Sequence, residues 1–163
     1  MKPTTKQLIN SISWSLDNKV APMTEDKWAA STLRSVRCLL THLATRADLE
    51  GQLLFDDNID LRDTLRRVET VLAPVSPALG AAISDVLRKE WRSPDEYPTV
   101  VSLTAENDAM RSVADVVLVA LRAGDVVDEH IRTEARGEVE SWVRRRLVRD
   151  QPLFLPAFMA NNF

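Results

Sequence analysis

The chain has 163 residues, of which 45% are hydrophobic and 28% are charged, and its formal net charge is −3. These values are ordinary for a soluble globular protein, so we expect residues 1–163 to form a single helical domain. The excess of acid is slight and the pI is near 5.4, which gives no electrostatic basis for binding nucleic acid. We therefore expect no nucleic-acid partner.

The cysteine count and the hydropathy pattern bear on location. The single cysteine, Cys38, excludes an intramolecular disulfide and fits a reducing compartment. The opening "MKPTTKQLINSISW" has no apolar signal core, and the apolar stretch "VVLVALRAG" is too short to span a bilayer. We expect a cytoplasmic protein with no membrane partner.

The first half of the sequence predicts three helices. Residues 4–20 carry an apolar stripe within one third of the helix circumference, and residues 25–48 carry a narrow seam with steps of four, three, four, three and four. The stripe consists of Leu8, Ile9, Ile12, Leu16 and Val20. The seam consists of Ala29, Leu33, Val36, Leu40, Leu43 and Ala47. The stretch "DLEGQLLFDDNI" indicates a loop, after which Asp60 is a candidate cap for a third helix with Leu61, Leu65, Val68 and Leu72.

The second half predicts three more helices. Ser76 followed by Pro77 is typical of a helix start, and "RSPDEYPTVVSL" indicates a connection. A fifth helix is expected from Thr104 to a left-handed cap at Gly124, and a sixth over residues 128–150. The fifth is apolar around most of its girth, so we expect it at the centre. The fold class predicted is all-α, an antiparallel bundle of about six helices.

The C-terminal tail, residues 151–163, is unusually apolar for a chain end. Ordering its last eleven residues costs about 11–22 kcal/mol of backbone entropy, whereas burying six large side chains returns about 9–18 kcal/mol. Only a nearly fully buried tail would stay in place, in a groove of its own bundle, which we favour, or of another chain. Its candidate interface residues are Leu153, Phe154, Leu155, Phe158, Met159 and Phe163.

Two tryptophans are further candidates for an interface, where tryptophan is enriched. Trp14 projects about 120° outside the apolar stripe of its helix at 3.6 residues per turn. Trp28 stands at the start of the second predicted helix.

Cys38 and His42 form the pair closest to a catalytic motif. They lie four residues apart on one helix face, and an imidazole beside a thiol can generate a nucleophile. No orienting acid and no glycine-rich oxyanion turn accompany them, so a chance pair or a pair beneath a partner is the alternative interpretation. They mark a possible pocket, and we assign no catalytic residue.

No metal or cofactor is expected. Asp56, Asn58 and Asp60 match the start of a calcium loop, but Leu61 stands where glycine is needed and Arg67 where a bidentate acid is needed. Neither histidine has the spacing of a di-iron site, and the four glycines form no phosphate loop. The arginines of "WVRRRLVRD" suit a helix C-terminus, with anion or nucleic-acid binding as a weaker alternative.

Three stretches resemble a family of small bacterial all-helical proteins of unassigned function, found beside acyl-CoA-dehydrogenase-like and aminoglycoside-phosphotransferase-like enzymes. They are "KPTTKQLINSISWSL", "APMTEDKWAASTLRSVRCLL", entered through Trp28, and "VRRRLVRDQPLF", with Asp150, Gln151 and Pro152. They cover under a third of the chain. Ala29, Ser31 and Ser35 stand where the family is expected to carry polar residues such as histidine, arginine and asparagine. The resemblance implies an accessory protein for an acyl-CoA- or kinase-linked pathway.

We therefore predict a non-catalytic helical interaction protein that forms homo-oligomers or docks onto a metabolic enzyme. The alternative is a small enzyme or ligand-binding protein with a pocket near Cys38 and His42.

Overall fold

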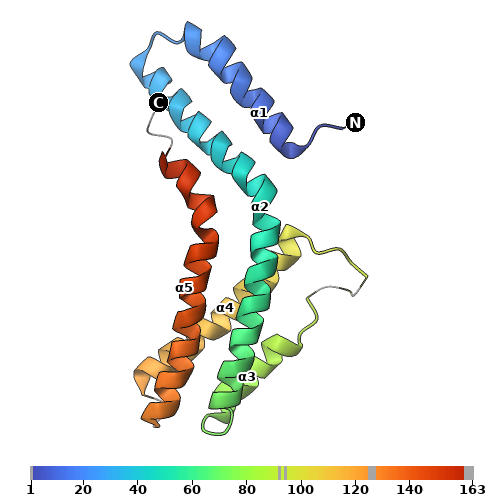
Figure 1. The fold of residues 1–163 in the computed structure, drawn as a ribbon, viewed down its shortest axis with the longest axis vertical. Helices are drawn as coiled ribbons and strands as arrows, with labels where there is room; N and C mark the ends of the chain where they lie inside the picture. Colours follow the sequence, from blue (N-terminus) through green and yellow to red (C-terminus); the bar gives the residue numbers. More distant parts are fainter. Residues whose placement is uncertain (1, 92, 94, 125–127, 160–163) are drawn as a thin grey trace. The chain divides into compact units, whose positions relative to one another are not determined.

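A computed structural model describes residues 2–91, 93, 95–124 and 128–159, with the backbone alone for 155–159. The regular secondary structure of these residues is entirely helical, with no strand, which confirms the all-α class (Figure 1). The α-helices are α1 (Thr5–Ser15), α2 (Lys27–Leu72), α3 (Pro77–Arg88), α4 (Val100–Ala123) and α5 (Glu129–Met159). A π-helical turn (Leu16–Val20) and a 3₁₀ turn (Ala21–Met23) follow α1.

The described residues contain five α-helices because the expected loop at residues 48–59 is helical. The second and third predicted helices are one helix, α2, and Asp60 is an interior residue rather than a cap. Two polar residues of this stretch hydrogen-bond to partners far along the chain. Asp57 and Asn58 are 3% and 4% exposed; Asp57 bonds to α4 and α5, and Asn58 bonds to α4.

Local signals predicted some helix ends correctly and missed others. Gly124 has a φ of 83°, the left-handed cap that was expected. Helix α3 begins at Pro77 as predicted, although the Ser76 side chain makes no capping hydrogen bond. Helix α4 begins earlier than expected, because Thr99, not Thr104, forms a capping box with Ser102.

The C-terminal helix extends further than predicted. Helix α5 starts after Asp128, whose carboxylate accepts from the backbone N–H groups of His130 and Ile131. It was expected to end at residue 150 but continues through Pro152 to Met159. Part of the expected tail is therefore helical.

The chain divides into two compact units, and α2 and α5 contribute to both. Unit 1 comprises residues 1–50 and 150–163, and unit 2 comprises residues 51–149. The prediction of a single domain stays a prediction.

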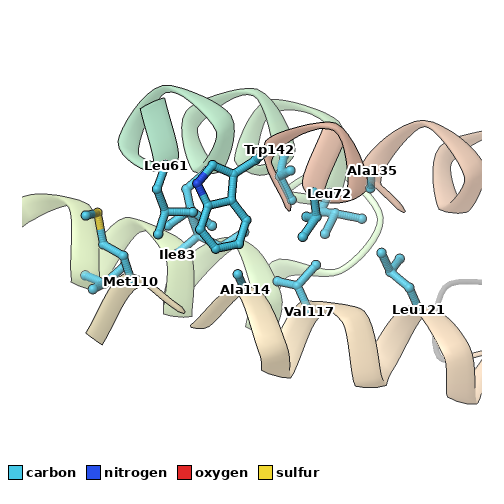
Figure 2. Packing of buried hydrophobic residues seen from close by; sticks show 13 residues of the cluster. Leu61, Leu72, Ile83, Met110, Ala114, Val117, Leu121, Ala135 and Trp142 are labelled. Atoms are coloured by element: carbon cyan, nitrogen blue, oxygen red, sulfur yellow. The ribbon is translucent and has the colours of Figure 1, made fainter. Parts of the chain in front are cut away.

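Unit 2 contains an extensive buried core. The predicted repeat on the second half of α2 supplies four of its residues, all at 0% exposure: Leu61, Leu65, Val68 and Leu72. Helices α3, α4 and α5 pack against these residues. In Figure 2 the indole of Trp142 points from α5 toward α4, where Ala114 is small enough to leave room for it.

Helix α4 is not buried on all sides. Its core residues, such as Met110 and Val117, are at most 1% exposed, but Val116 and Val119 are 52% and 65% exposed. The expectation of a central helix was therefore wrong. The hydropathy of α4 overstates its burial because valines lie on its open face as well.

Candidate interaction surface

Two ion pairs fix how α1 and the π-helical turn that follows it lie against the first part of α2 in unit 1. Lys6 Nζ lies 2.5 Å from Asp48 Oδ2, and Arg37 Nε lies 2.7 Å from Asp17 Oδ1. The paired residues are three helical turns apart on each helix, so they mark the line along which each helix faces the other. The earlier residue of one helix pairs with the later residue of the other, so these segments run antiparallel as a hairpin.

The apolar residues of this hairpin lie to one side of that line. At about 100° per residue, the stripe of α1 and the seam of α2 are each offset by about a quarter turn from the ion-paired line. In antiparallel helices these two offsets point to the same side. We call the resulting surface the hairpin face. Its large residues are Leu8, Ile9, Ile12, Leu16, Leu33, Val36, Leu40 and Leu43.

The exposure of these side chains agrees with that geometry. Residues nearer the ion-paired line, such as Ile9 and Leu40, are half-buried. Residues further round remain open. Their exposed fractions are 51% for Leu8, 50% for Ile12, 37% for Val36 and 51% for Leu43. Among the described residues of unit 1, Ala44, at 8% exposure, is the one buried hydrophobic residue, so the hairpin alone leaves much of its apolar surface in water.

Trp14 and Trp28 are both exposed, at 59% and 83%, but they do not extend the hairpin face. By the same count of residues per turn, Trp14 lies on the opposite side of the hairpin, where Lys19 Nζ approaches its ring centroid at 5.9 Å. Trp28 points away from α1. The two predicted interface tryptophans therefore do not share one surface.

The tail is described only in part. Leu153 is half-buried and Phe154 is 53% exposed. The side chains of Leu155, Phe158 and Met159, and all of Phe163, lie outside the described residues. Docking of the tail in its own bundle or in another chain stays a prediction.

Cys38 and His42 lie within α2, in unit 1, and both are half-buried. The Nδ1 atom of His42 is buried and has no hydrogen-bond partner in the described part of the chain, so the imidazole is not oriented by an acid there. Nucleophilic catalysis requires a base that a third group holds in orientation, and no such group is found for His42 among the described residues. A pocket at this pair stays a prediction.

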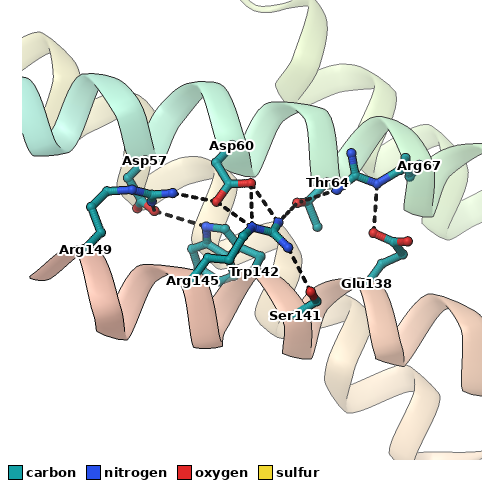
Figure 3. A network of polar contacts seen from close by, with 9 residues as sticks. All are labelled: Asp57, Asp60, Thr64, Arg67, Glu138, Ser141, Trp142, Arg145 and Arg149. Carbon is teal, nitrogen blue, oxygen red and sulfur yellow. Dashed lines mark hydrogen bonds and ion pairs between the residues drawn. The ribbon is translucent and has the colours of Figure 1, made fainter.

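Unit 2 contains a buried polar network that the sequence did not predict (Figure 3). Oδ1 of Asp57 accepts from Trp142 Nε1 at 3.1 Å and from Arg149 Nη1 at 2.5 Å. Its Oδ2 accepts from Asn107 Nδ2 at 2.8 Å, and Arg146 Nη1 lies 3.6 Å from the same oxygen. Asp57 thereby connects α2, α4 and α5.

Asp60 continues this network one turn along α2. It accepts two hydrogen bonds from Arg145 Nε at 3.1 Å, one from Arg145 Nη2 at 2.7 Å, and one from Arg149 Nη2 at 2.6 Å. Burial opposes ionisation of Asp60, but the hydrogen bonds from both arginines outweigh it and hold the pKa of its carboxyl below the ordinary value. The hydrogen bond with Asp60 raises the pKa of Arg145 in turn.

The arginine cluster of α5 therefore pairs mainly with acids of α2 and does not stabilise a helix end. Helix α5 continues to Met159, and Arg144 pairs with Glu140 while the other three arginines pair with Asp57 or Asp60. The interpretation as helix-end stabilisation was wrong. Spacing gave one signal that could have revealed the network: Asp57 and Asp60 share a face of α2, and Arg145 and Arg149 share a face of α5.

A cavity of about 300 Å³ lies in unit 2. Its apolar lining includes Phe55, Ile59, Leu103 and Trp91, and its polar lining includes Asn58, Arg62, Lys89 and Glu106. Arg62 bonds to Glu106 at 2.5 Å and to the carbonyl of Leu87 at 2.8 Å. Lys89 Nζ lies 4.1 Å from the Trp91 ring centroid, and Trp91 Nε1 is buried without a hydrogen-bond partner among the described residues.

Within the described ranges, no group of three or more histidine, cysteine or acidic residues is placed to hold a metal. None of the helices, as far as the structure describes them, combines the length and the hydropathy that crossing a bilayer requires. Comparisons with protein-family models, with curated proteins and with solved structures found no match.

Proposed function

We propose that this chain is a non-catalytic helical interaction protein of the cytoplasm, which self-associates or docks onto a metabolic enzyme. The hairpin face is its contact surface. One observation carries the proposal: large apolar side chains of α1 and α2 gather on one side of the hairpin, and four of them are 37–51% exposed. Contiguous apolar patches of more than a few hundred Å² are unusual on monomers and mark binding surfaces.

The family resemblance supports the enzyme as a partner class, because it implies an accessory protein beside acyl-CoA-dehydrogenase-like or kinase-like enzymes. The hairpin face supports the existence of a contact surface but does not indicate which protein binds there. The two lines of support are independent, so an experiment can separate them.

The test is native mass spectrometry of the chain purified from its own host, comparing wild type with Leu43→Lys. A charge at this half-exposed position should abolish any assembly made through the hairpin face while leaving the helices intact. Leu147→Lys is the matched control, since Leu147 is also an exposed helical leucine, at 66%, but lies in unit 2. The proposal fails if no assembly is detected, or if both variants assemble like the wild type.

A second candidate function is binding of a small amphipathic anion in the cavity of unit 2. The volume of about 300 Å³ is at the lower end for ligand sites, and the lining combines apolar walls with Lys89. The buried Nε1 of Trp91 is a donor that lacks an acceptor among the described residues. A small carboxylate with an apolar body would match these groups.

Thermal unfolding with a panel of short-chain and aromatic carboxylates tests this second function. A ligand should raise the melting temperature of the wild type and have less effect on Lys89→Met, which removes the charge and keeps most of the side chain. Equal shifts for both proteins, or none for either, would rule out the cavity as the binding site.

A further inference from the structure

We infer that a second copy of this chain covers the hairpin face. Two hairpins would pack face to face about a two-fold axis, and α1 with the first part of α2 from each copy would form a four-helix bundle. This inference rests on the proposed function and names its partner.

The spacing of the α2 seam is the first argument. Steps of four and three residues are the pattern by which a helix packs into another helix along a narrow line. Helix α1 does not occupy that line, because the Lys6–Asp48 and Asp17–Arg37 ion pairs place α1 about a quarter turn away from it. The seam therefore lacks a facing helix within the described hairpin.

The composition of the face is the second argument. The residues that define it are uncharged, and Thr5 and Thr32 are polar residues at its edges. It therefore offers no charge and few hydrogen bonds with which to select a partner of different chemistry. A two-fold axis brings a surface against itself, and an uncharged face with regular helical spacing is complementary to its own copy.

The size of the face is the third argument. The seam runs from Ala29 to Ala47, about 27 Å at 1.5 Å per residue, and two adjacent helices are about 20 Å wide. That outline covers about 540 Å², and the accessible area of a ridged helical surface exceeds its outline. Specific interfaces bury about 600–1,000 Å² on each partner, so the face matches the smaller dimer interfaces.

Sedimentation velocity of the purified chain over a range of concentrations up to tens of micromolar tests the inference. We expect a species of about 37 kDa, twice the 18.3 kDa of one chain. Leu43→Lys and Ile12→Lys, each with its circular dichroism checked for helix content, should sediment as monomers. Leu147→Lys should remain a dimer. Because the two variants lie on different helices, the test still stands if one of them fails to fold.

Three results would overturn the inference, and they differ in what they imply for the proposed function. A wild-type monomer at every concentration refutes the second copy, yet leaves the proposed function standing if native preparations show an enzyme partner that Leu43→Lys loses. A dimer that survives both face variants refutes the face as a contact surface, and the proposed function with it. A dimer lost only on deletion of residues 155–163 assigns the contact to the tail instead.

Discussion

Asp57 is a carboxylate at 3% exposure, where a charge is tolerated only if its lost hydration is replaced. Trp142, Arg149 and Asn107 replace it with three hydrogen bonds. Asp57→Ala would leave the Arg149 guanidinium and the Trp142 indole N–H without this acceptor. We expect it to lower the free energy of unfolding by about 3–5 kcal/mol, measured by urea denaturation.

The matched control for Asp57→Ala is Asp63→Ala. Asp63 pairs with Arg66 one turn away at 2.8 Å, but both side chains are more than half exposed. Exposed pairs contribute less than about 1 kcal/mol. Similar losses for the two variants would show that the buried network contributes no more to stability than a surface pair.

Asp60 makes stability depend on pH in the acid range. Its pKa in the folded state lies below the unfolded value of about 3.9, because hydrogen bonds from Arg145 and Arg149 outweigh the effect of burial. The unfolded chain therefore binds the proton more readily. The stabilisation is present above the unfolded pKa and disappears as the pH falls through the folded one.

Urea midpoints measured from neutral pH down to pH values below about 3.9 should show this loss in the wild type. In Asp60→Asn the fall toward acid should be shallower, because the side chain no longer titrates. Equal acid dependence in the two proteins would mean that the Asp60 hydrogen bonds do not favour its charged form.

Among the elements, α2 is the helix whose continuity can be tested most directly. Gly51 lies in its interior, in the stretch that the sequence presents as a loop. A Cβ at this position would lie 3.8 Å from Val100 Cγ2, an ordinary contact. Gly51→Ala should therefore raise the free energy of unfolding by about 0.5–1 kcal/mol, measured by urea denaturation, because alanine loses less conformational entropy in a helix.

Gly80→Ala is the contrasting variant. It makes the same substitution within a helix, but the new Cβ would lie 2.9 Å from the Cβ and 3.0 Å from the Cα of Ala73. Backbone must shift to accommodate it, so we expect this variant to be less stable than the wild type. A stabilising Gly80→Ala would place α3 further from Ala73 than described here, and a neutral or destabilising Gly51→Ala would contradict an unbroken α2.

Some features of the helices could be predicted from the sequence and others could not. Periodicity predicted the buried residues Leu61, Leu65, Val68 and Leu72, and glycine chemistry predicted the cap at Gly124. The segment at residues 48–59 could not be predicted in the same way. Asp57 within it bonds to Arg149, 92 residues away, and Asp60 just after it bonds to Arg145, 85 residues away. No pattern within the segment itself carries that information.

The candidate interaction surface was predictable as two separate parts. The stripe on α1 and the seam on α2 are both visible in the sequence, but nothing local says that they lie on the same side. That requires the pairings of Lys6 with Asp48 and of Asp17 with Arg37. Trp14 was already placed outside the apolar stripe by its position in the sequence, and it is 59% exposed. A place for Trp14 and Trp28 in an interface stays a prediction.

At the scale of the whole molecule, the two units differ in how much apolar surface they bury. Unit 2 holds a cluster of thirteen buried hydrophobic residues, whereas the described part of unit 1 holds Ala44. Regions with few buried apolar contacts open at lower free energy. Native-state hydrogen exchange should therefore show weaker protection of amides in α1 than of those near Leu65. Uniform protection across both units would contradict this difference.

Self-association through the hairpin face would make the local stability of α1 depend on protein concentration. A partner that binds only the folded hairpin stabilises it by mass action, so the opening free energy of α1 should rise with protein concentration in the wild type. Amides near Leu65, in a core complete within one chain, should not respond. Leu43→Lys should remove the dependence, since its hairpin has no second copy to bind. If α1 in wild type exchanges at one rate across the full concentration range, the uncovered face is a property of the monomer, and the stability of α1 arises from contacts within the chain.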